Sequence, residues 1–146
     1  KLDNELFNLF EEVDTAGQSF KKLKKIAFSL MESPYLWGGR TPLGIDCSGF
    51  TQLIYKTIGI PIKRDAKDQE SEGIPVDLLS KSKEGDLAFF INKEKKIHHT
   101  GLILEDNTIM HACGKVRIDN LDDDGIYNKD KKSYTHKLHS IKRILI

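Results

Sequence analysis

The stretch GIDCSGFTQLIYKTIGIP, residues 44–61, places a cysteine at the boundary between a loop and a helix. Apolar residues recur after Cys47 at helical spacing, and Gly59 followed by Pro61 marks the end of the run. Asp46 is a favourable N-cap residue, so Cys47 is expected in the first helical turn. Unpaired backbone N–H groups and the helix dipole favour a thiolate there. Cys47 is therefore either a nucleophile or a small buried residue that begins a core helix.

The segments before this helix are predicted to form two short helices and a loop. Apolar residues at three- and four-residue steps predict helices over residues 2–13 and 20–30, and Pro34 ends the second of them. Residues 34–45 are rich in proline and glycine and fit neither helical nor strand spacing, so they are predicted to be a loop.

The segments after the helix change to the alternating pattern of β-strands. The predicted strands are 86–91, 98–104, 108–113, 115–118 and 142–146. Helices followed by antiparallel strands indicate an α+β fold. The charged insertion 119–140 lacks apolar periodicity and is predicted to be a surface loop.

Length and composition limit the classes of protein that fit. The chain has 146 residues, which suits one domain, and 23 basic against 22 acidic residues, which leaves no positive surplus for nucleic acid. No apolar run approaches the roughly 18 residues of a membrane span. Two cysteines do not make a disulfide framework. Because the chain begins with Lys1, we expect that a leader or an upstream domain has been removed.

The turn between the second and third predicted strands decides which histidine faces His111. A two-residue turn would place His98 on the face of His111, whereas a three-residue turn ending at Asn107 would place His99 there. We favour the three-residue turn, because asparagine tolerates the left-handed conformation and the small Gly101 then leaves room beside His111.

A cysteine at a helix start, a histidine on a facing strand and a second polar residue form the Cys-His-X arrangement of papain-like hydrolases. In this interpretation His99 takes the thiol proton and later protonates the leaving amine, while His111 fixes the tautomer of His99. A zinc site of His98, His99, His111 and Cys113 is the alternative. His98 points to the opposite face from the others, so we expect no metal and no cofactor.

Five motifs, in order and at similar spacing, resemble the NlpC family of cell-wall cysteine peptidases. They are YLWGGRTPLGIDCSGF (35–50), RDAKDQ (64–69), EGDLAFF (84–90), HHTGLIL (98–104) and MHACGKVRI (110–118). The resemblance runs from about Tyr35 to Ile146. It implies a papain-like α+β fold with N-terminal helices packed on a central antiparallel sheet. It also implies Cys47 as the nucleophile, His99 as the base and His111 as the third polar residue. We expect one domain, 1–146, with a helical lead-in (1–33) and a catalytic core (34–146).

The resemblance further implies a substrate site and a substrate. Tyr35, Asp46 and Ser48 match residues that line the family's substrate site, and Asp46 is placed to contact a free amine. The family typically cuts the bond between γ-D-glutamate and the diamino acid of peptidoglycan stem peptides. The form GGRTPLGIDCSGF (38–50) resembles its γ-D-glutamyl-L-diamino acid endopeptidase branch, which often carries SH3-like domains upstream. This sequence contains no such domain.

Two other functions use the same or a similar fold. An acyl- or amidotransferase would resolve the same thiol acyl-enzyme with an amine instead of water. A non-catalytic wall-binding module would keep the fold without the chemistry, and the complete Cys-His-His set argues against it. We expect a monomer that acts on a peptidoglycan or murein peptide outside the cell, in the wall or in the periplasm. Cytoplasmic murein recycling is the alternative location. Cys113 stands where the family usually has a small polar residue, and no function explains it.

Overall fold

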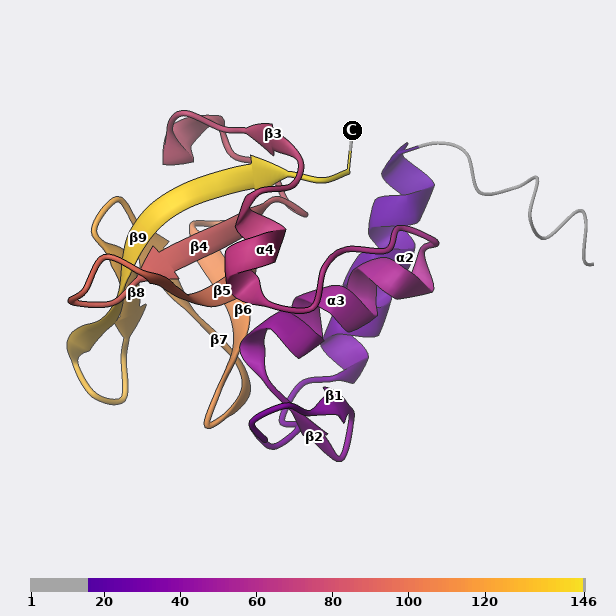
Figure 1. Cartoon of the computed structure of the whole chain (residues 1–146), viewed down its shortest axis with the longest axis horizontal. Coiled ribbons are helices and arrows are strands. Elements are labelled where there is room, and N and C mark those ends of the chain that lie inside the picture. Colours follow the sequence, from indigo (N-terminus) through magenta and orange to yellow (C-terminus); the bar gives the residue numbers. More distant parts are fainter. Residues whose placement is uncertain (1–15, 146) are drawn as a thin grey trace, which may run out of the picture.

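The computed structural model describes residues 16–145, so the helix predicted over residues 2–13 lies outside the described residues. Among the described residues, three α-helices precede the strands of the large sheet: α2 (Ala16–Ser29), α3 (Cys47–Thr57) and α4 (Ala66–Glu70). Helices α2 and α3 lie side by side against one side of the strands (Figure 1). Among the described residues, no helix is both long and apolar enough to cross a bilayer.

Helix α3 begins where its sequence predicts. The Asp46 side chain accepts a hydrogen bond of 2.7 Å from the backbone N–H of Gly49, which caps the helix. The chain turns away after the helix at Gly59, whose φ of 81° is a conformation that glycine adopts without strain. Before α3, the predicted loop contains a short hairpin of β1 (Arg40–Thr41) and β2 (Gly44–Ile45).

The remaining strands form a closed barrel and not the plain central sheet that was expected. The strands are β3 (Ile74–Pro75), β4 (Leu87–Ile91), β5 (Ile97–Leu104), β6 (Thr108–Cys113), β7 (Lys115–Asp122), β8 (Gly125–Asn128) and β9 (Ser133–Arg143). A short 3₁₀ turn, Leu79–Lys81, precedes β4. The hydrogen-bonded order is β3-β9-β4-β5-β6-β7-β8, and β9 also pairs with β8. Within the described residues, β4 to β9 therefore close on themselves, so the prediction of an α+β fold is confirmed and the form of the sheet is corrected.

The prediction of a surface loop over residues 119–140 is wrong. This segment forms the end of β7, all of β8 and most of β9. The last strand is accordingly β9, Ser133–Arg143, and not residues 142–146 as predicted. Polar side chains such as Asp119 and Asn128 are buried here. Because buried positions in these strands carry polar residues, the alternation of apolar and polar residues that marks a strand is weak.

The hairpin between β5 and β6 has the predicted register. Leu104 pairs with Thr108, which leaves a three-residue turn, and Asn107 has a φ of 54° in the left-handed region. Gly101 of β5 lies against His111 of β6, since a Cβ built on this glycine would come 2.9 Å from the His111 Cβ. The turn thus sets the face on which the histidines meet.

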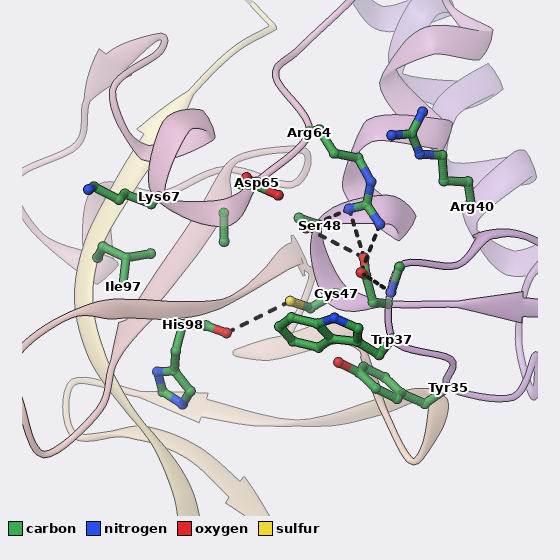
Figure 2. A pocket seen from close by; sticks show the side chains of 13 residues that line it. Tyr35, Trp37, Arg40, Cys47, Ser48, Arg64, Asp65, Lys67, Ile97 and His98 are labelled. Atoms are coloured by element: carbon green, nitrogen blue, oxygen red, sulfur yellow. Dashed lines mark hydrogen bonds and ion pairs between the residues drawn. The ribbon is translucent and has the colours of Figure 1, made fainter.

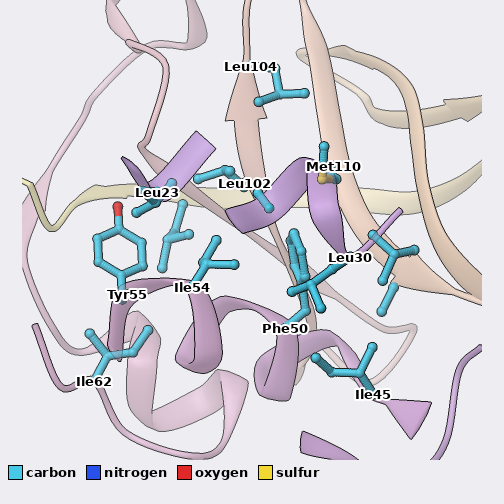
Figure 3. Packing of buried hydrophobic residues seen from close by; sticks show 14 of the residues in the cluster. Leu23, Leu30, Ile45, Phe50, Ile54, Tyr55, Ile62, Leu102, Leu104 and Met110 are labelled. Atoms are coloured by element: carbon cyan, nitrogen blue, oxygen red, sulfur yellow. The ribbon is translucent and has the colours of Figure 1, made fainter. Parts of the chain in front are cut away.

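Two apolar clusters hold the site in place. The larger lies between the helices and the barrel, and Figure 3 shows Phe50 and Ile54 of α3 packed near Leu102 of β5. The smaller cluster contains Phe90 of β4, Ile103 of β5 and other residues of the strands β4 to β9. Removing this apolar surface from water fixes α3 against β5 and so fixes Cys47 relative to that strand.

Candidate active site

Cys47 lies at the first position of α3, against the beginning of β5. Its side chain is 8% exposed, and its Sγ lies 3.9 Å from the carbonyl oxygen of His98, to which the thiol can donate (Figure 2). Burial raises the pKa of the Cys47 thiol, and the nearby Asp46 carboxylate adds to this effect. Backbone N–H groups, including that of Thr100, act in the opposite direction without overcoming it. The shift toward a thiolate expected from the helix terminus is therefore reversed by burial, and the resting group is a thiol.

The histidines are arranged as the hairpin register predicts. Nε2 of His99 lies 2.8 Å from Nδ1 of His111, and both rings are buried. His98, the preceding residue, is exposed. On its other side, Nε2 of His111 lies 2.8 Å from Oδ2 of Asp119. Arg117 in turn donates to both carboxylate oxygens of Asp119, at 2.8 and 2.9 Å.

A third ring, that of His136 on β9, covers one face of His99. The two ring centroids are 4.0 Å apart and the planes are inclined by 24°. Burial, together with the neighbouring imidazoles His136, His111 and His98, lowers the pKa of His99 well below its usual value. Burial also lowers the pKa of His136 to about 3. His99 and His136 are therefore neutral near pH 7.

One nitrogen from each of His99, His111 and His136 lies within 4.8 Å of the other two. Three imidazoles at such spacing are possible ligands for a transition metal. The nearly parallel stack of His99 and His136 keeps their lone pairs from converging on one point, however, and nitrogens of His99 and His111 are hydrogen-bonded to each other. The group also differs from the zinc set considered from the sequence, because it contains neither His98 nor Cys113.

A cleft of about 430 Å³ opens beside the thiol. All three residues implied by the family resemblance line it together with Cys47: Tyr35, Asp46 and Ser48. Arg64 also lines this cleft, with an ion pair of 2.8 Å to Oδ2 of Asp46 and a hydrogen bond of 2.9 Å to Oγ of Ser48 (Figure 2). His98 also lines the cleft, whereas His99 does not.

The Asp46 carboxylate is fully engaged. Besides Arg64, it accepts hydrogen bonds from the backbone N–H groups of Gly38 at 2.9 Å and Gly49 at 2.7 Å. Burial alone would raise the pKa of Asp46, but these donors, Arg64 above all, hold it below its usual value. Asp46 therefore remains ionised and anchors both the helix start and the loop that precedes it.

Sequence reasoning missed four residues at or near this site. Trp37 is 86% exposed and lines the cleft, in a loop whose irregular sequence gave no reason to single it out. Arg64 lies in the motif RDAKDQ (64–69), but the family resemblance implies no role for its arginine. Asp119 and His136 lie in the segment that was predicted to be a loop. An alternation test extended past Ile118 would have placed Asp119 on the face of His111.

Comparison with known proteins identifies the family to which this chain belongs. A family model described as NlpC/P60 matches residues 32–135. The chain belongs to the NlpC/P60 family. A gamma-D-glutamyl-L-lysine dipeptidyl-peptidase of Bacillus subtilis is 46% identical over 83 residues, which cover 54% of this chain and 27% of that protein. A dipeptidyl-peptidase 6 of Lysinibacillus sphaericus is 35% identical over 108 residues, which cover 71% of this chain and 38% of that protein.

Solved structures of NlpC/P60 proteins share the fold. A family protein from Bacillus cereus aligns with a TM-score of 0.75 at 30% identity, over 87% of this chain and 40% of that one. This NlpC/P60 chain thus spans between 27% and 40% of the length of these three relatives. The shared part contains Cys47, His99 and His111, all of which fall inside residues 32–135.

Proposed function

We propose that this NlpC/P60 chain is a cysteine endopeptidase that hydrolyses peptidoglycan stem peptides at the bond between γ-D-glutamate and the diamino acid. One observation carries the proposal: Cys47 begins a helix that is packed against the strand bearing His99, and His99 is hydrogen-bonded to His111. The Bacillus subtilis relative is named a gamma-D-glutamyl-L-lysine dipeptidyl-peptidase, and this name supports the choice of bond.

The first step in this proposal is removal of the thiol proton. Because Cys47 rests as a thiol and His99 as a neutral imidazole, the site begins as an uncharged pair. Among the described residues no group hydrogen-bonds to Nδ1 of His99, which leaves that lone pair free to accept a proton. The thiol, which rests against the His98 carbonyl, turns toward His99 when substrate is bound.

The thiolate then attacks the γ-carbonyl carbon of D-glutamate. The oxyanion that forms lies at the N-terminus of α3, where backbone N–H groups near Cys47 are available as donors. As the C–N bond breaks, protonated His99 gives its proton to the amine of the diamino acid. Water, deprotonated by His99, then attacks the thioester, and this releases the γ-D-glutamyl acid and returns the proton to Cys47.

The cleft supplies the groups for substrate recognition. Tyr35 and Ser48 line it beside Cys47 and are proposed to contact the peptide. The Asp46 carboxylate already accepts hydrogen bonds from four residues: Gly38, Ser48, Gly49 and Arg64. A free amine of the substrate would meet it in addition to these donors, so we propose that Asp46 acts mainly by placing Arg64 and Cys47. We further propose that the enzyme acts as a monomer, outside the cell, in the wall or in the periplasm.

The test uses synthetic L-Ala-γ-D-Glu-diamino acid tripeptides, with L-Lys or meso-diaminopimelate in the third position and with free or acetylated N-termini. Products are identified by mass. Release of the free diamino acid together with L-Ala-D-Glu is the expected result. Products that form only when a second amine is added, and that contain that amine, would favour the acyl- or amidotransferase instead. Cleavage at the L-Ala–D-Glu bond would contradict the proposed specificity.

A further inference from the structure

We infer that Asp119 and Arg117 determine which nitrogens of the His99–His111 pair carry protons, and that they thereby place the free lone pair on Nδ1 of His99. Asp119 and Arg117 are thus positioning residues that act through His111. The catalytic consequence rests on the function proposed above, whereas the protonation pattern itself does not.

The strand pairing explains why these residues meet. On the neighbouring strands β6 and β7, His111 and Arg117 are directly paired. Asp119 follows Arg117 by two positions on β7, so both side chains leave the strand on the face of His111. The Asp119 side chain is only 3% exposed, and Arg117 reaches it with two hydrogen bonds from one guanidinium. Such a bidentate pair fixes the orientation of the carboxylate.

The donor and the acceptor of each hydrogen bond between Asp119, His111 and His99 can be assigned in order. An ionised carboxylate has no proton to give, so Asp119 accepts from His111, and Nε2 of His111 carries a hydrogen. A neutral His111 then has a lone pair on Nδ1, which accepts from Nε2–H of His99. Neutral His99 with its hydrogen on Nε2 has its lone pair on Nδ1. That is the atom that has no partner among the described residues.

Arg117 helps to keep Asp119 ionised, which is the condition for this assignment. Burial alone would raise the pKa of Asp119, but hydrogen bonds from His111 and Arg117 hold it below its usual value. The guanidinium is itself anchored by a 2.9 Å contact to Asp130 at the surface. A neutral group at position 119 that could donate to Nε2 of His111 would reverse the direction of both hydrogen bonds and put a hydrogen on Nδ1 of His99. The base would then be blocked.

The experiment measures the tautomers directly. The whole chain is labelled with ¹⁵N-histidine, and long-range ¹H–¹⁵N spectra at pH 7.5 assign the hydrogen on each ring of the wild type and of Asp119→Asn. We expect Nε2–H on both His99 and His111 in the wild type, and Nδ1–H on both in the variant, because the amide can donate to His111. Nδ1–H on either ring in the wild type would overturn the inference, even if Asp119→Asn fails to fold.

The kinetic part uses the same variant and a matched control. Asp123→Asn removes a similar charge from an exposed position in the turn after β7. We expect Asp119→Asn to lower kcat by about 10³-fold or more with KM changed less than about threefold, as when a triad histidine takes the wrong tautomer. Asp123→Asn should leave kcat, KM and both tautomers unchanged. A folded Asp119→Asn with wild-type kcat, or one that is inactive with wild-type tautomers, would overturn the inference.

Failure of the proposed function would give a different result. If the wild type does not cleave stem peptides, the tautomers still test the role of Asp119 without substrate. Alkylation of Cys47 by iodoacetamide then replaces turnover as the readout of the base. We expect Asp119→Asn to slow this alkylation at pH 7.5 and Asp123→Asn to leave it unchanged. Equal rates in both variants would count against the inference.

Discussion

Nε2 of His99 lies 2.8 Å from Nδ1 of His111, across two strands whose register is set by a three-residue turn. A change of one residue in that turn would have brought His98 to the same place. The choice of His99 as the proposed general base therefore follows from hairpin geometry, and it can be tested by comparing two adjacent histidines.

Substitution of these neighbours should have opposite outcomes. His99→Ala removes the proposed base and is expected to lower kcat for the tripeptide by about 10³-fold or more. His98→Ala leaves the His99–His111 bond intact and should retain at least about one third of the wild-type kcat, since His98 meets the thiol through its backbone carbonyl. Steady-state kinetics at pH 7.5 decide the point. An inactive His98→Ala variant together with an active His99→Ala variant would show that His99 is not the general base.

Gly101 is expected to be intolerant of even one added methyl group. A Cβ there would come 2.9 Å from the His111 Cβ and 2.8 Å from Cδ1 of Ile109, so His111 would have to move away from His99. Gly101→Ala should lower kcat at least about tenfold and destabilise the fold by roughly 1–3 kcal/mol through overpacking. Gly114→Ala is the control, because nothing lies within 4 Å of a Cβ built there, although its φ of 69° adds some strain of its own. A wild-type kcat in Gly101→Ala would contradict the proposed role of His111 in the reaction.

Local signals were sufficient to predict the half of the site that lies on α3 and on the β5–β6 hairpin. A helical repeat, an N-cap aspartate and a short turn with asparagine each act over a few residues, so the sequence alone places Cys47, His99 and His111 correctly on their elements. The expected N-terminal position of Cys47 was right, but its expected thiolate was not. Burial depends on what α3 packs against, and this is not visible in a local pattern.

Closure of the barrel could not be predicted in the same way. Its last strands carry buried polar residues, and such residues are stable only because distant partners satisfy them, as Arg117 does for Asp119. His136 likewise reaches His99 only through pairing between β9 and β4. A strand whose buried side is polar gives no alternation of hydrophobicity, so Asp119 and His136 were assigned to a loop.

Acid should destabilise the fold through the half-buried His136. The folded-state pKa of His136 is lowered to about 3, below the usual value of 6.5, so the unfolded state binds more protons between these values. The free energy of unfolding is therefore expected to fall as pH drops from about 6.5 toward about 3. His136→Gln should show a smaller loss between pH 7.5 and pH 4.5 in urea unfolding. The exposed His139 provides the control, since His139→Gln should behave as the wild type. An unchanged pH dependence in His136→Gln would contradict this assignment.

Asp46 should contribute to stability more than an ordinary surface aspartate. Asp46→Ala removes the cap of α3 and the bond to Gly38, and it leaves the partly buried Arg64 without its partner, so we expect a loss of about 1–3 kcal/mol. Asp65 is the matched control, because it occupies the N-cap position of α4 without a side-chain capping bond. Asp65→Ala should cost under about 0.5 kcal/mol. Equal losses in denaturant unfolding would mean that the contacts of Asp46 add little.

The two cysteines give the most direct test of the central claim that Cys47 is the nucleophile of a stem-peptide peptidase. Wild type, Cys47→Ala and Cys113→Ala are incubated with L-Ala-γ-D-Glu-L-Lys at pH 7.5, and release of free lysine is followed by mass. We predict a loss of at least about 10³-fold for Cys47→Ala, because among the described residues Cys47 is the only thiol that lines the cleft, and a thioester needs a thiol. Cys113→Ala should release lysine within about threefold of the wild-type rate. Lysine release by Cys47→Ala at a rate near that of the wild type would contradict the account.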